Sequence, residues 1–144
     1  LGIAPNKVIL LGQTSQYEHL KTYNQVDISL DPFPYGGGIT TYESLFMGTP
    51  VVSLINDLKI VHRNSSATLL PLGLDDWVAK TKDEYVEIVC NWANNLENLA
   101  QLREQLRGQM EERISVFVPQ VEIAYREMWR RWCRGEEPSS IYIK

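Results

Sequence analysis

The sequence holds few of the residues from which metal sites and disulfides are built. It has two histidines and two cysteines, Cys90 and Cys133, which lie far apart. Because neither cysteine has a histidine nearby, we interpret both as ordinary thiols of a cytosolic protein and not as a disulfide or zinc site. The aspartates are also too scattered to predict a metal site. We therefore expect neither a metal nor a cofactor.

Charge of one sign and long apolar runs are scarce as well. The formal net charge is -4, and no block of like charge stands out, so we expect no nucleic-acid surface. The apolar runs are far shorter than the roughly 20 residues that span a bilayer, and no signal peptide opens the chain. These absences predict a cytoplasmic location without a membrane partner. The composition, 44% hydrophobic and 22% charged, is that of a globular domain.

Short apolar runs alternate with helical patterns in the first part of the chain. Three runs rich in Val and Ile are bounded by Gly, Pro or Asp, which predicts strands buried on both faces. They are KVILLG (7–12), VDISLD (26–31) and PVVSLI (50–55). The intervening segments, 14–25 and 39–48, predict helices, with Thr14 or Ser15 as an N-cap and Gly48 as a C-cap. The alternation predicts a parallel α/β sheet.

The rest of the chain predicts a short helix over 64–74, a short final strand within 75–81, and then helices only. The last of these helices is expected to start at Pro119, a favoured residue at the first helical position. Three apolar faces recur at helical spacing. They comprise Tyr85, Ile88, Val89 and Trp92; Leu99, Leu102 and Leu106; and Val121, Ala124, Tyr125, Met128 and Trp132. We expect the tryptophans to be core anchors: Trp77, Trp92, Trp129 and Trp132.

A glycine-rich turn follows the second predicted strand, in DPFPYGGGITTYESL (31–45). Ligands of such sheets bind beyond the carboxyl ends of the strands. Glycines allow close approach of the backbone, and a helix start offers unpaired N–H groups and a positive dipole end, which together suit a phosphate. Thr40 and Thr41 add hydroxyl donors, and Glu43 could accept hydrogen bonds from a ribose diol. The same residues also suit a plain strand-to-helix turn capped by threonine, because neither a GxGxxG nor a P-loop motif is present.

The wider sequence resembles the C-terminal catalytic region of tetratricopeptide-linked protein O-GlcNAc transferases and their bacterial relatives. The most specific block is VDISLDPFPYGGGITTYESLFMGTPVVSL (26–54). The resemblance continues through HRNSSATLLPLGL, KDEYVEIVCNWANN and LAQLREQLR to VEIAYREMWRRWCRGEEP, and so covers almost the whole chain. It implies an α/β fold with a Rossmann-like parallel sheet, the C-terminal half of a GT-B glycosyltransferase, followed by a helical C-terminal segment.

The resemblance also implies a division of the chain and a set of donor-binding residues. Residues 1–144 would form one partial domain, with a Rossmann-like nucleotide-sugar-binding part over 1–81, helices over 82–136 and a tail over 137–144. The turn and helix start would hold the diphosphate, Glu43 the ribose, and the start of the preceding helix would lie near the nucleotide. The expected donor-binding residues are Gly36, Gly37, Gly38, Ile39, Thr40, Thr41, Glu43, Gln16, His19 and Arg63.

Three of these positions depart from the family pattern. Ile39 stands where threonine is usual, which removes a side-chain contact to phosphate but keeps the backbone N–H. Gly38 stands where some members have histidine, and Gln16 where some have lysine. From the residues alone, His19 also suits a surface or capping role, and His62 with Arg63 an anion site. We expect a side chain added at Gly37 to block the phosphate while sparing the fold.

The resemblance implies that the catalytic residues lie in an N-terminal half, preceded by a tetratricopeptide array, that the chain lacks. The donor would be a nucleotide sugar, UDP-GlcNAc first, although relatives also use UDP-glucose or GDP-fucose. The acceptor, a protein Ser/Thr hydroxyl, would be held by the missing parts. An absent strand would lie between 7–12 and 26–31, so we expect the isolated chain to be inactive and to self-associate. The alternative is a non-catalytic Rossmann-like interaction module of a tetratricopeptide protein.

Overall fold

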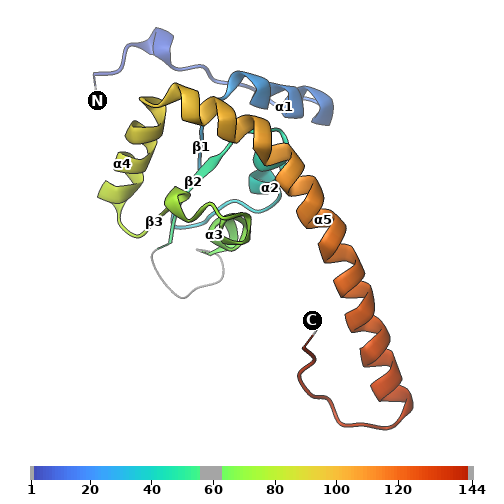
Figure 1. Ribbon diagram of the computed structural model, residues 1–144. Helices are drawn as coiled ribbons and strands as arrows, with labels where there is room; N and C mark the ends of the chain where they lie inside the picture. The colour runs from blue at the N-terminus through green and yellow to red at the C-terminus, as the bar shows by residue number, and fades with distance from the viewer. Residues whose placement is uncertain (1, 56–62, 143–144) are drawn as a thin grey trace.

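The computed structural model describes residues 2–55 and 63–142, and within them one small parallel sheet lies at the centre of the body (Figure 1). The strand order is β1-β2-β3, with both pairings parallel. The strands are β1 (Ser29–Leu30), β2 (Val51–Leu54) and β3 (Val78–Ala79). They lie inside three of the four segments in which strands were expected. The prediction of a parallel α/β sheet is therefore confirmed.

Helices connect the strands and cover the sheet (Figure 1). Before β1 come η1 (Pro5–Lys7), α1 (Gln16–Thr22) and η2 (Tyr23–Gln25), and between β1 and β2 comes α2 (Ile39–Phe46). Before β3 come α3 (Asn64–Leu69), η4 (Leu70–Leu72) and η5 (Asp75–Trp77), and after it α4 (Lys82–Ala93) and α5 (Leu96–Cys133). Ser15 caps α1, as expected, because its hydroxyl accepts the N–H of Glu18 at 3.3 Å. Gly48 follows the end of α2 at a φ of 77°, which glycine adopts readily.

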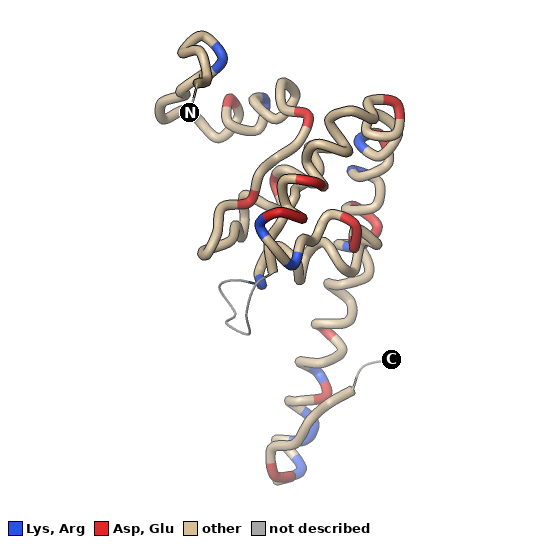
Figure 2. The backbone as a smooth tube through the Cα atoms, turned by 90° about the vertical axis from the view of Figure 1, so that its left-hand side faces the viewer, with Lys and Arg blue, Asp and Glu red and all other residues tan. Residues whose placement is uncertain are grey.

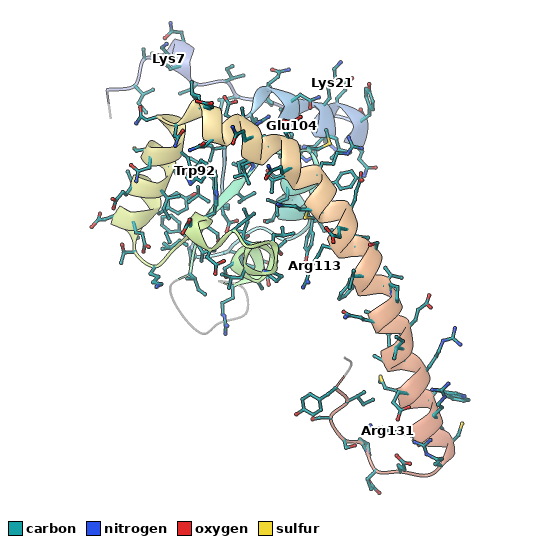
Figure 3. The ribbon with its side chains drawn as sticks, viewed as in Figure 1. Lys7, Lys21, Trp92, Glu104, Arg113 and Arg131 are labelled. Atoms are coloured by element: carbon teal, nitrogen blue, oxygen red, sulfur yellow. The ribbon has the colours of Figure 1, made fainter. Side chains whose placement is uncertain are left out.

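The core lies between the sheet, α4 and the first half of α5. All four residues of β2 are buried, as expected for a central strand. Trp77 is 1% exposed, and its ring stacks on Trp92 with centroids 4.7 Å apart. Trp92 points from α4 into the body (Figure 3). The expected core roles of these two tryptophans, and of the faces around Tyr85 and Leu106, are confirmed.

Residues 7–12 do not form the expected strand. A single 3₁₀ turn covers Pro5–Lys7, and no regular element follows until α1. Val8, Ile9, Leu10 and Leu11 are 53–90% exposed. A strand exists only where a neighbour takes its backbone hydrogen bonds, and among the described residues none lies beside this run. The prediction of a strand over 7–12 is therefore wrong for this chain.

Helix α5 also differs from the expectation. It runs unbroken for 38 residues with Pro119 inside it, so no helix starts at that proline. Its buried residues, Leu99, Leu106 and Met110, all lie in the first half. The second half extends away from the body (Figure 1), and Trp129 and Trp132 are 66% and 75% exposed. The prediction that these two tryptophans anchor the core is therefore wrong for this chain, because they line a hollow with the tail at 136–141 and do not belong to the core cluster.

The surface shows no dominant sign of charge. Figure 2 shows acidic and basic residues interspersed along the backbone. Both cysteines are free and exposed. None of the described helices combines the length and the hydropathy needed to cross a membrane.

Candidate functional site

The start of α2 lies just beyond the carboxyl end of β1 and presents free backbone donors. Gly38 is the N-cap residue, and no described side chain caps the helix. Ile39 and Thr40 are exposed, and their N–H groups donate to no acceptor among the described residues. Unpaired N–H groups at a helix start, together with the positive end of the helix dipole, attract an anion. The structure therefore contains the unpaired backbone N–H groups that the predicted phosphate-binding site requires, and the binding itself stays a prediction.

Two side chains that were predicted to lie near the nucleotide meet beside this helix start. The Nε2 atom of His19, on α1, lies 3.2 Å from the Oε2 atom of Glu43, on α2. The His19 ring also meets Tyr23 edge to face, and the Tyr23 hydroxyl donates to the Thr40 carbonyl oxygen at 3.4 Å. Burial, and then the carboxylate of Glu43, raise the pKa of Tyr23, so this hydroxyl stays protonated at neutral pH. Helices α1 and α2 thus bring polar side chains together beside the start of α2.

A network of buried and partly buried hydrogen bonds holds the glycine-rich turn in place. The Oδ1 atom of Asp31 accepts the Gly37 N–H at 2.6 Å, and its Oδ2 atom accepts the Ser53 hydroxyl at 2.8 Å. The Ser65 hydroxyl donates to the Gly37 carbonyl oxygen at 3.2 Å. Thr41 Oγ1 lies 2.9 Å from the same Ser65 oxygen. Asp31, which follows β1, and Ser65 of α3 therefore hold Gly37 directly, and Ser53 of β2 holds Asp31.

The structure brings most of the expected donor-binding residues to this end of the sheet, though not all to the surface. Gly38, Ile39 and Thr40 are exposed, whereas Gly36 and Thr41 are buried. Since the Thr41 hydroxyl is engaged with Ser65, the geometry favours a supporting role for Thr41, and its contact with donor stays a prediction.

The other predicted residues stand around the turn. Gln16 is the first residue of α1 and is exposed. Arg63 is the exposed N-cap residue of α3, two positions before Ser65, which reaches the turn. His62 lies outside the described residues. Glu43 is partly buried and already paired with His19, so a ligand would meet an oriented carboxylate.

The expectation for Gly37 needs correction. A Cβ atom there would lie 2.5 Å from Thr41 Oγ1 and 3.1 Å from Asp31 Oδ1, so a side chain would disrupt the network below the turn. It would not spare the fold. At Gly38 an added Cβ would meet nothing within 4 Å. Gly38 is therefore the position at which a side chain changes the surface and leaves the fold intact.

Sequence reasoning missed the supporting residues, Asp31, Ser53 and Ser65. A signal for them was present, because a serine within a strand buried on both faces needs a hydrogen-bond partner. Its partner could not be named, since Ser53 and Asp31 are 22 residues apart in the sequence.

A hollow of about 300 Å³ lies beside β1 and the start of α2, lined by Tyr23, Asp31, Thr40 and Ser44 among others. A larger hollow, of about 620 Å³, lies against α4, but four carboxylates line it against one basic residue, Lys80; they are Asp75, Asp76, Glu84 and Glu87. Carboxylates repel a diphosphate, so we place the candidate site at α2. In the part of the chain that the structure describes, no three His, Cys, Asp or Glu side chains gather as metal ligands would.

The chain is similar to several known proteins. The family model described as glycosyl transferase family 41 matches residues 1–121. A tomato (Solanum lycopersicum) protein named "Probable UDP-N-acetylglucosamine--peptide N-acetylglucosaminyltransferase SPINDLY" is 39% identical over 96% of this chain. A Caenorhabditis elegans UDP-N-acetylglucosamine--peptide N-acetylglucosaminyltransferase is 26% identical over 93% of it. The chain spans only 15% and 12% of these two relatives.

The solved structure of an O-GlcNAc transferase mutant from Thermobaculum terrenum matches with a TM-score of 0.80 and 36% identity. The match covers 93% of this chain and 26% of that one. Together with the parallel sheet, it confirms the expected Rossmann-like half of a GT-B fold with a helical C-terminal segment. The chain belongs to glycosyl transferase family 41.

Proposed function

We propose that this chain supplies the nucleotide-sugar donor site of a glycosyltransferase that moves a sugar to protein Ser/Thr hydroxyls. The observation that carries the proposal is the pair of free N–H groups at Ile39 and Thr40, beside the joined side chains of His19 and Glu43. The named relatives point to UDP-GlcNAc as the donor. The protein acceptor and the groups that activate it belong to other parts of the parent protein, which we take to be cytoplasmic.

The chemistry of this site is electrostatic. When the bond between the anomeric carbon and the diphosphate breaks, negative charge grows on the leaving diphosphate. The N–H groups at the start of α2 are fixed before the reaction and stabilise that charge without reorganising. Glu43 accepts hydrogen bonds from the ribose hydroxyls, and His19 holds its carboxylate in place. The acceptor hydroxyl attacks from the opposite side of the sugar, as an inverting transfer requires.

Calorimetry with UDP on the full-length parent protein tests the proposal. We expect binding at millimolar concentration or tighter, weakened by Thr40→Val, which keeps the shape of the side chain and removes its hydroxyl. Thr68→Val on α3 is the matched control. Absence of UDP binding to the full-length protein would contradict the proposal and favour a non-catalytic interaction module.

We also propose that the chain self-associates when isolated. Among the described residues, β1 has β2 on one side and no strand on the other. Leu30 at this open edge is 58% exposed, and the strand-like run at 8–11 is exposed as well. Open edges recruit strands from other chains. A second copy offers such a strand in residues 8–11.

A further inference from the structure

The side chain of Asp31 is a buried carboxylate that the proposed chemistry does not use directly. Asp31 is 6% exposed and follows β1, where its N–H still donates to the Val52 carbonyl oxygen at 3.0 Å. Within the described residues no Lys, Arg or His nitrogen lies within salt-bridge distance of it. A buried carboxylate is costly unless hydrogen bonds satisfy it. Its two oxygens are therefore committed to the partners that they contact, Gly37 and Ser53.

These partners fix the peptide groups that precede α2. Asp31 takes the N–H of Gly37, and Ser65 takes its carbonyl oxygen, so both ends of this residue are held. The residue that follows, Gly38, is the N-cap of α2, and its carbonyl oxygen accepts the Thr41 N–H at 3.1 Å. Ile39 and Thr40 lie between Gly38 and Thr41, the two residues that this last hydrogen bond joins. Their free N–H groups consequently have one direction in space.

We propose that Asp31 is a positioning residue for donor binding. With Ser53 behind it, its carboxylate holds the Gly37 N–H and thereby aims the N–H groups of Ile39 and Thr40 at the donor diphosphate. This inference rests on the proposed function. Its physical basis is preorganisation, because a turn that is ordered before binding loses less conformational entropy when the ligand arrives.

A negative residue beside a phosphate seat needs an explanation, and the geometry supplies one. Each carboxylate oxygen of Asp31 accepts a hydrogen bond from the protein, one from the Gly37 N–H and one from the Ser53 hydroxyl, and these bonds offset the negative charge at the edge of the hollow that Asp31 helps to line. Ionised acceptors form hydrogen bonds about twice as strong as neutral ones. A carboxylate therefore holds a glycine turn more firmly than an amide or a hydroxyl in the same place.

The test is a graded series in the full-length parent protein. Asp31→Asn keeps the shape and one neutral acceptor oxygen, and we expect the Kd for UDP to rise about threefold. Asp31→Ala removes both acceptors, and we expect a rise of about tenfold or more in the Kd for UDP and in the KM for the nucleotide sugar. The KM for the protein acceptor should stay unchanged. Hydrogen–deuterium exchange in the peptide over 32–38 should accelerate in the same order.

Ile88→Ala, on the core face of α4, is the matched control for loss of stability alone. It should lower the Tm without changing the Kd for UDP or the exchange at 32–38. Should Asp31→Ala not fold, Asp31→Asn decides, and an unchanged Kd and exchange rate in that variant would overturn the inference. A folded Asp31→Ala protein with the Kd of the unsubstituted protein would overturn it too. If the unsubstituted protein binds no UDP, the proposed function itself fails and this inference with it.

Discussion

The imidazole Nε2 of His19 and the carboxylate Oε2 of Glu43 lie 3.2 Å apart, although 24 residues separate them in the sequence. The contact joins α1 to α2 on the side of the helix start that carries the free N–H groups. It also leaves one Glu43 oxygen for a further partner. We therefore expect the two residues to act on a ligand as one unit, so that the effects of their substitutions are not additive.

We expect Glu43→Ala to weaken UDP binding by about tenfold or more, since a hydrogen bond to a charged group contributes about 1.5–3 kcal/mol. His19→Ala should weaken it by only a few fold, because the histidine acts through Glu43. The double variant should resemble Glu43→Ala alone. Calorimetry on the full-length protein measures all three, with Glu18→Ala on the exposed side of α1 as the control. Additive effects would show that His19 contacts the nucleotide independently.

Two substitutions of the same shape, Gly38→Asp and Gly38→Asn, test by charge alone whether the diphosphate binds at the start of α2. A side chain fits there, as an added Cβ meets nothing within 4 Å. Gly38→Asp should weaken UDP binding by about tenfold, because it places a negative charge beside the helix start. Gly38→Asn has the same shape without the charge and should bind UDP nearly as well as the unsubstituted protein. Equal affinities of the two variants would place the diphosphate elsewhere.

The stacked pair of Trp77 and Trp92 should account for much of the stability of the body. Trp77→Ala should lower the free energy of unfolding by about 3–5 kcal/mol, the range for a large buried aromatic residue. Trp92 is only partly buried, so Trp92→Ala should cost less, about 2–3 kcal/mol. Urea unfolding of the 144-residue chain measures both. Trp132→Ala is the control, because this side chain is 75% exposed and should change little.

The Tyr85 hydroxyl should make stability sensitive to alkaline pH. It donates to the Asp31 carbonyl oxygen at 3.1 Å, and burial, with the Asp31 carboxylate second, raises the pKa of Tyr85 to about 12. The folded-state pKa lies above the unfolded value of about 10, so the contribution is full below pH 10 and is lost between about pH 10 and 12. Urea unfolding over this range should show a smaller loss for Tyr85→Phe than for the unsubstituted chain. Tyr142→Phe, at an exposed site, should behave like the unsubstituted chain.

The isolated chain should self-associate at micromolar concentration in sedimentation experiments. Leu30→Lys puts a charge on the open edge of β1 and should reduce the association, as edge lysines do in natural sheets. Leu70→Lys, at another exposed leucine, should not. A clean monomer with a cooperative melt would show that the open edge is harmless and that no strand is missing beside it.

Features with local causes could be predicted from the sequence. The helices over 16–22, 39–46 and 82–93 follow from capping residues and apolar spacing, and β2 follows from a short apolar run between turn residues. Features that depend on distant partners could not. Residues 7–12 have the composition of a strand, but a strand requires neighbours. Pro119 favours a helix start, yet α5 continues through it, and the β-branched and aromatic residues before the proline give no local reason for this.

The same division holds for the candidate site. The glycines, Thr40 and Glu43 could be proposed because they follow one another in a turn and a helix start. The joining of Glu43 with His19 and of Asp31 with Gly37 depends on how α1, β1 and α2 come together. For the same reason, sequence reasoning could not tell that Thr41 faces inward or that Gly37 has no room for a side chain.

The unbroken course of α5 makes the number of residues in it matter as much as their identity. At about 1.5 Å and 100° per residue, its 38 residues span about 57 Å, and each inserted or deleted residue turns everything beyond it by more than a quarter of a circle. Trp129 and Trp132 would therefore point in a new direction after any single insertion between Met110 and Trp129. A change of four residues, about one turn, would return them to within about 40° of the same side of the axis, and a change of seven to within about 20°. The number of residues in α5 beyond the core therefore determines the direction in which the two tryptophan side chains point. Homologues that differ there by one residue would place these tryptophans in different surroundings.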